Sequence, residues 1–134
     1  MSNKAHGMVF SKSGVPMKAQ EFPFSRLKES ELLVKIKYAT ICGSDLHTYR
    51  GLRKTPVPTI LGHEIIGSIE TLPHGNPIKD YYGDDLKVGD SITWSIAASC
   101  GDCHYCKINI PQKCRNLFKY GHEQITEHHP LSGG

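Results

Sequence analysis

The sequence predicts a mainly β protein with few short helices. Several short runs alternate between apolar and polar residues, which is typical of half-buried strands. Helical periodicity is sparse, and only one short helix stands out as a candidate. The sequence shows no alternation of strands with helices and no G-x-G-x-x-G after a strand, so it carries no visible dinucleotide-binding fold.

The first predicted elements are a hairpin and a strand. Residues 8–10 and 15–17 are short apolar runs that flank the turn-forming residues 11–14, which predicts a β-hairpin. Residues 31–38 alternate and predict a half-buried strand, with lysines on its outer face. Its predicted inward side chains are Val34, Ile36 and Tyr38.

A helix and two further strands follow. The helix is expected from Ser44 to about Tyr49, with Ser44 or Asp45 as its cap. Residues 62–72 predict an isoleucine-rich strand, and Gly67 within it indicates a bulge or a close backbone approach. Residues 91–96 predict a strand, and residues 74–85 predict an exposed loop. The strand's predicted inward side chains are Ile92, Trp94 and Ile96.

Length, composition and charge limit the class of protein. The 134 residues indicate one domain, and 38% hydrophobic against 22% charged residues argues against bulk disorder. A net charge of +3 is too small to indicate nucleic acid or an anionic membrane as the main partner. No run approaches the roughly 20 apolar residues of a membrane helix, and the N-terminus lacks an apolar signal core. We therefore expect a cytoplasmic protein in a reducing compartment.

The five cysteines divide into one isolated residue, Cys42, and a group of four within fifteen residues. An odd number in a reducing setting argues against disulfides and favours metal ligands or reactive thiols. Four thiolates complete the tetrahedral shell of Zn²⁺ and leave no open position, which predicts a structural zinc site. Its ligands would be Cys100, Cys103, Cys106 and Cys114.

An iron–sulfur cluster is the alternative for this group, because C-x2-C-x2-C also opens ferredoxin motifs. Those motifs usually place a Cys-Pro pair four residues after the third cysteine, whereas Ile110 stands at that position and Cys114 precedes Arg115. Zinc is therefore favoured. His104 is expected to face solvent, because four sulfurs already fill the metal shell.

Cys42 and His63 form a second candidate site from two separate segments. Both residue types bind zinc well, and such a pair can belong to an open catalytic site. A lone cysteine is also often a small buried hydrophobe, and spacing alone leaves that alternative open. His122-Glu123 repeats the letters of His63-Glu64 but lacks a preceding ligand motif, so it is not expected to bind metal.

These motifs together resemble the zinc-dependent, medium-chain alcohol dehydrogenase family, in order and over nearly the whole chain. They are Cys42-Gly-Ser44-Asp45-Leu-His47, Pro58-Thr-Ile-Leu-Gly62-His63-Glu64 leading to Gly67, Val88-Gly89-Asp90, and the four-cysteine spacing. The resemblance implies that residues 1–134 form a GroES-like partial barrel, the N-terminal part of a catalytic domain. Residues 111–123 and 131–134 are similar to phosphonate-catabolism-associated alcohol dehydrogenases.

The resemblance also implies roles for individual residues. Cys42 and His63 would be ligands of a catalytic zinc, whose third protein ligand would lie beyond residue 134. Glu64 would orient the ligands or approach the metal itself, with a plain surface carboxylate as the alternative. Ser44 and His47 would relay the proton that the reaction releases. Their alternatives are a helix cap for Ser44 and an exposed helix residue for His47.

The implied function is hydride transfer between a small-molecule alcohol, or its aldehyde or ketone, and NAD or NADP. The enzyme would hold one catalytic and one structural zinc and would form a homo-oligomer at full length. The Ser-Gly-Gly end is interpreted as a truncation before a Rossmann domain, so the isolated chain is expected to be inactive. The alternative is a stand-alone zinc-binding GroES-like module without catalysis.

Overall fold

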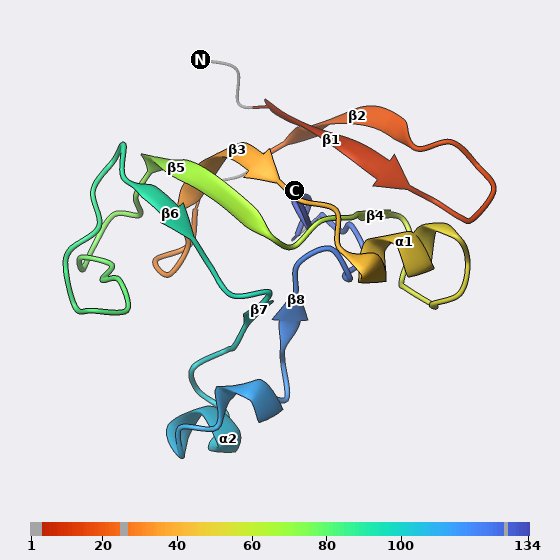
Figure 1. The fold of residues 1–134 in the computed structure, drawn as a ribbon. Coiled ribbons are helices and arrows are strands. Elements are labelled where there is room, and N and C mark those ends of the chain that lie inside the picture. Colours follow the sequence, from red (N-terminus) through yellow and green to blue (C-terminus); the bar gives the residue numbers. More distant parts are fainter. Residues whose placement is uncertain (1–3, 25–26, 128) are drawn as a thin grey trace.

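The computed structural model describes residues 4–24, 27–127 and 129–134. The sequence predicts a loop at His128 and His129, and His128 lies outside the described residues. The described chain is built mainly from short strands, as the sequence predicts, arranged in three small sheets. Figure 1 shows two three-stranded sheets above a small lobe that carries the third. None of the helices in the described ranges is long and apolar enough to cross a membrane.

The first sheet has the order β2-β1-β4. Its strands are β1 (Lys4–Phe10), β2 (Lys18–Pro23) and β4 (Thr59–Ile60). β1 and β2 form the predicted antiparallel hairpin, with Val9 opposite Lys18. The expected strand at residues 15–17 is wrong, because this register leaves those residues in the connecting loop. Val9, Phe22 and Ile60 form the core of this sheet, and Ile125 and Leu131 pack against it.

The second sheet has the order β3-β5-β6. Its strands are β3 (Leu33–Ala39), β5 (Ile65–Thr71) and β6 (Ser91–Thr93). The close approach predicted at Gly67 is confirmed, since a Cβ there would lie 2.7 Å from the carbonyl oxygen of Lys35. The register of β3 shifts between Ile36 and Tyr38, opposite this glycine. Gly67 therefore allows β3 and β5 to pair closely around a bulge.

Two predicted inward faces are confirmed only in part, since Val34, Ile92 and Trp94 are half-buried but three other side chains are exposed. Tyr38 is 73% exposed and Ile36 is 42% exposed, because the bulge interrupts the alternation of β3. Ile96 is 41% exposed, because β6 ends at Thr93 and the chain then leaves the second sheet for the lobe. The predicted loop at residues 74–85 is confirmed, apart from a single bridge between Lys79 and Asp85.

The predicted helix is confirmed as α1 (Gly43–Tyr49). Cys42 occupies its N-cap position, so the expectation of Ser44 or Asp45 as the cap is wrong. Asp45 stands three residues further on, where its Oδ2 accepts a hydrogen bond from the Cys42 backbone N–H at 2.9 Å. A carboxylate in the first turn also suits the positive end of the helix dipole. The N-cap residue of the helix is thus the cysteine that the motif offers as a metal ligand.

The lobe contains the four clustered cysteines and extends away from both sheets (Figure 1). Its elements are β7 (Ala97–Ala98), α2 (His104–Lys107), the 3₁₀ helix η1 (Pro111–Lys113) and β8 (Phe118–Lys119). β7 and β8 pair antiparallel and form the base of the lobe. The chain then returns to the sheets, where Ser132 is fully buried and its Oγ accepts a hydrogen bond from the Ile60 N–H at 3.2 Å.

Candidate metal centres

The four clustered cysteines converge on one point in the lobe. Every sulfur of the group lies within 4.8 Å of the others, and three of the separations are 3.5, 3.6 and 4.0 Å. A tetrahedron with Zn–S bonds of about 2.3 Å has S–S edges of about 3.8 Å. The sulfurs of Cys100, Cys103, Cys106 and Cys114 therefore fit the shell of a single zinc ion.

Local backbone structure holds these sulfurs in place. Cys103 is the N-cap residue of α2, and Cys114 is the C-cap residue of η1. The Cys114 Sγ accepts hydrogen bonds from the backbone N–H groups of Cys100 and Asn116, both at 3.3 Å. Such donors favour the thiolate, which is the form that binds metal. The lobe is therefore arranged to receive a cation.

The environments of the sulfurs also separate their acidities. Backbone N–H donors, first that of Arg115 and then that of Cys106, lower the pKa of Cys103 to about 6. Burial, together with the thiol of Cys103, raises the pKa of Cys106 to about 11. Without metal, Cys103 is therefore the more acidic thiol of the two, and Cys106 keeps its proton more readily. His104 is exposed and stands outside the group of four, in agreement with the sequence analysis.

The second candidate centre lies where the N-terminus of α1 meets the start of β5. One ligand atom each from Cys42, His63 and Glu64 lies within 4.8 Å of the others. The set combines a thiol, an imidazole and a carboxylate, all of which bind zinc. Cys42 is half-buried, His63 is buried and Glu64 is exposed, so the group opens toward solvent on its carboxylate side. Spacing alone did not place these residues together, but the fold does.

Glu64 is held by a neighbour in the chain segment that leads to α1. The Thr40 hydroxyl donates a hydrogen bond to Glu64 Oε2, and the Thr40 backbone N–H donates to the Glu64 carbonyl oxygen at 3.0 Å. The carboxylate is therefore anchored beside Cys42 and His63 rather than free on the surface. This placement suits either of the two roles implied for Glu64 near a metal.

Asp45 lies next to His63, on the side of the ring that carries Nδ1. Its Oδ1 lies 3.5 Å from His63 Nδ1, and both residues are buried. The two atoms form no hydrogen bond within the described part of the chain. A ligand histidine usually presents its second ring nitrogen to a carboxylate, and the placement of Asp45 is compatible with that role. Nδ1 faces Asp45, so Nε2 is left for a metal. Sequence reasoning gave Asp45 no role at the metal, although its place three residues after a ligand cysteine was a usable signal.

The two residues expected in a proton relay lie on α1. Ser44 Oγ is buried and has no hydrogen-bond partner in the described part of the chain. His47 is exposed, three residues further along the helix, and so lies on the same side of it. The cap interpretation of Ser44 is wrong, because Cys42 holds that position. The hydroxyl is left free to bond to another group.

His122 is a neighbour of the second centre that the motifs did not indicate. It is 7% exposed, and the centre of its ring lies 5.0 Å from that of His63. Burial, with further effects from Arg53 and His63, lowers the pKa of His122. The histidine of the second His-Glu pair therefore lies beside the histidine of the first, although it adds no ligand to the group of three.

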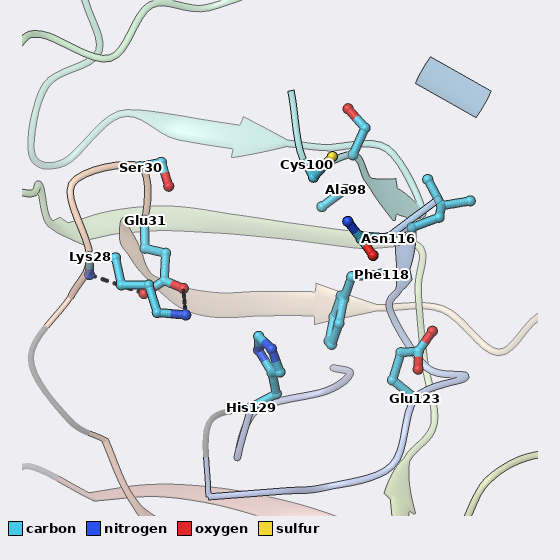
Figure 2. Close-up of a pocket in the computed structure, with 11 residues that line it drawn as sticks. Lys28, Ser30, Glu31, Ala98, Cys100, Asn116, Phe118, Glu123 and His129 are labelled. Carbon is cyan, nitrogen blue, oxygen red and sulfur yellow. Dashed lines mark hydrogen bonds and ion pairs between the residues drawn. The ribbon is translucent and has the colours of Figure 1, made fainter. Parts of the chain in front are cut away.

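Two surface hollows of about 520 Å³ each lie near these centres. The first, shown in Figure 2, lies between the lobe and residues 28–31, where Lys28 and Glu31 form an ion pair at 3.5 Å. The second contains His63 and Glu64 and is bordered by the apolar side chains of Ile66 and Trp94. The second hollow therefore places two of the candidate ligands beside apolar side chains.

Several known proteins are similar to this chain. The alcohol dehydrogenase GroES-like domain model matches residues 28–133. Zinc-type alcohol dehydrogenase B of Aspergillus flavus is 31% identical over 124 residues, which are 92% of this chain and 27% of that protein. An alcohol dehydrogenase from Thermotoga maritima superposes with a TM-score of 0.81 at 38% identity, over 97% of this chain and 36% of that one.

A short chain alcohol dehydrogenase from Escherichia coli CFT073, complexed with NADH, superposes with a TM-score of 0.74 at 28% identity. The match covers 99% of this chain and 34% of that one. The chain thus spans between about a quarter and a little over a third of the length of these relatives. The family model, in contrast, covers most of the chain. The chain belongs to the alcohol dehydrogenase GroES-like domain family.

Proposed function

We propose that this chain is the metal-binding part of a zinc-dependent alcohol dehydrogenase that uses NAD or NADP. The observation that carries the proposal is the group formed by Cys42, His63 and Glu64 beside an apolar-walled hollow. A structural zinc in the lobe and a catalytic zinc at this group would account for both clusters. We further propose that a protein as long as the relatives has a nucleotide-binding domain, supplies a third protein ligand to the catalytic zinc and forms a homo-oligomer.

Each residue of the second centre has a proposed task. Cys42 and His63 bind the zinc, and Asp45 keeps His63 in the tautomer that offers Nε2. Glu64 offsets the metal charge or binds the metal in alternation with other ligands. Zinc, when bound, supplies Lewis-acid polarisation of the alcohol or carbonyl oxygen. Ile66 and Trp94 provide an apolar border to the hollow, against which the carbon side of the substrate packs.

The released proton needs a route from the hollow to solvent. The buried hydroxyl of Ser44 can accept a proton and donate its own. His47 is exposed, so its imidazole can exchange protons directly with water. The proposed direction is from the substrate hydroxyl to Ser44 Oγ, then to the His47 ring and water.

Elemental analysis tests the proposal directly. The zinc-loaded protein is expected to contain about two zinc ions per chain, one for each ligand set. His63→Ala is expected to remove one of these zinc ions. In a protein as long as the relatives, it is also expected to abolish the alcohol-dependent reduction of NAD⁺ or NADP⁺. Retention of both zinc ions in His63→Ala would contradict the catalytic assignment.

The alternative of a stand-alone module predicts a different result. A non-catalytic module needs only the zinc of the lobe, so the wild-type protein would already contain about one ion per chain and His63→Ala would not change that number. The convergence of Cys42, His63 and Glu64 favours the enzyme. The closer resemblance to phosphonate-associated dehydrogenases stays a prediction.

A further inference from the structure

The triplet Gly-His-Glu occurs twice in the chain, at residues 62–64 and 121–123. The two histidines lie side by side, with ring centres 5.0 Å apart and planes tilted by 37°. We propose that His122 is a positioning residue of the second metal centre, where its ring holds the ring of His63 in the orientation that binds metal. This inference rests on the proposed metal role of Cys42, His63 and Glu64.

The backbone brings the two triplets together. A Cβ on Gly121 would lie 2.7 Å from the Gly62 carbonyl oxygen and 2.9 Å from its nitrogen, so only glycine allows this approach. The Gly121 N–H donates to the Ser132 carbonyl oxygen at 2.6 Å, and the His122 N–H donates to the Lys119 carbonyl oxygen at 3.1 Å. Because each glycine directly precedes its histidine, contact between the glycines sets the two rings beside each other.

The His63 ring is thereby restrained in two ways. Asp45 lies at its Nδ1 edge, at 3.5 Å, and favours one tautomer. An edge contact alone leaves the ring free to rock about its bond to Cβ, since that torsion is broad. The His122 ring lies against that of His63, and both residues are 7% exposed. It therefore limits the motion that Asp45 leaves open.

The ring nitrogens of His122 make no contact that explains how it restrains His63. Its atoms stand outside the group of three ligand atoms, and its buried Nδ1 has no hydrogen-bond partner among residues 4–24, 27–127 and 129–134. His122 consequently acts through His63 rather than on the metal. The flat ring is the feature used, which distinguishes this role from both metal ligation and mere filling of space.

Two variants of similar volume separate a flat ring from simple bulk. His122→Phe keeps a ring and His122→Leu fills the space without one, and both substitutions preserve apolar packing. The matched control is His129→Leu, since His129 also packs on an aromatic ring, that of Phe118, with centres 5.0 Å apart but at the other hollow. Zinc content of the lobe and the unfolding temperature report that each variant is folded.

The first measurement is made on protein whose second centre is free of metal. Nitrogen chemical shifts of the His63 ring report its tautomer, and line widths report its motion. We expect His122→Phe and His129→Leu to keep the wild-type spectrum, and His122→Leu to show a mixed tautomer or broadened signals. Identical His63 spectra in the Phe and Leu variants would overturn the inference.

The second measurement is the affinity of the second centre for Co²⁺, by competition with a chelator while the lobe holds zinc. We expect His122→Leu to weaken binding about tenfold and His122→Phe to stay within about twofold of wild type. Equal affinities in the two variants would overturn the inference. If wild type binds no metal at this centre, the proposed function fails, and the His63 spectra still decide whether His122 holds the ring.

Discussion

Asp45 Oδ1 lies 3.5 Å from His63 Nδ1, with both side chains buried at the N-terminal end of α1. The same carboxylate accepts the Cys42 backbone N–H through its other oxygen. One side chain thus links the two residues that the sequence offers as ligands. The first turn of α1 positions the thiol, and the carboxylate at its third position lies beside the imidazole.

This link predicts the effect of Asp45→Asn. The amide oxygen can still accept the Cys42 N–H, so α1 should form normally. The amide NH₂ would then face His63 Nδ1 and favour the tautomer with its proton on Nε2, which cannot bind metal. We expect the affinity of the second centre for zinc to fall about 10- to 100-fold, as measured by chelator competition. Asp84→Asn, in the exposed loop, is the control and should leave that affinity unchanged.

The charge of Glu64 is also open to test. Glu64→Gln keeps an acceptor for the Thr40 hydroxyl but removes the negative charge beside Cys42 and His63. We expect weaker zinc binding at the second centre, by about tenfold or more. Glu70→Gln, on the exposed face of β5, serves as the matched control. An unchanged affinity in Glu64→Gln would contradict a role for Glu64 at the metal and would favour the alternative of a plain surface carboxylate.

The lobe should respond independently of the second centre. Cys103→Ser removes one of four sulfurs, and we expect the loss of about one zinc ion per chain and a lower unfolding temperature, because metal binding supplies folding energy. His104→Ala tests the neighbouring exposed histidine and should retain the zinc. Full zinc content in Cys103→Ser, by elemental analysis, would refute the four-cysteine assignment.

The contact between Gly121 and Gly62 predicts a stability difference between two equivalent substitutions. Gly121 and Gly14 have φ values of 75° and 77°, so alanine meets the same backbone strain at both. A Cβ on Gly14 meets nothing within 4 Å, whereas one on Gly121 would lie 2.7 Å from a backbone oxygen. We expect Gly121→Ala to cost about 1–3 kcal/mol more than Gly14→Ala in the free energy of unfolding. Denaturant titration measures both, and equal costs would argue against the close approach.

Short-range sequence patterns predicted several local elements and one of the two candidate metal sites. The spacing of Cys100, Cys103, Cys106 and Cys114 predicted one metal shell, because a chain that turns between nearby ligands can wrap a single ion. The helix after Cys42 and the strand through Gly67 were likewise visible, since both follow from local periodicity and glycine placement. The extents of β3 and β6 were less predictable, because a bulge and a departure toward the lobe depend on pairing with distant strands.

The arrangement around His63 was decided by tertiary structure alone. Asp45 and His122 lie 18 and 59 positions from His63 in the sequence, so no local period relates them to it. His122 carries no ligand motif of its own, and its ring lies beside that of His63, a candidate ligand. The sequence determined which residues can bind metal. Packing of α1, β5 and the returning C-terminal segment determined which neighbours hold those residues in place, since a buried contact depends on long-range chain approach.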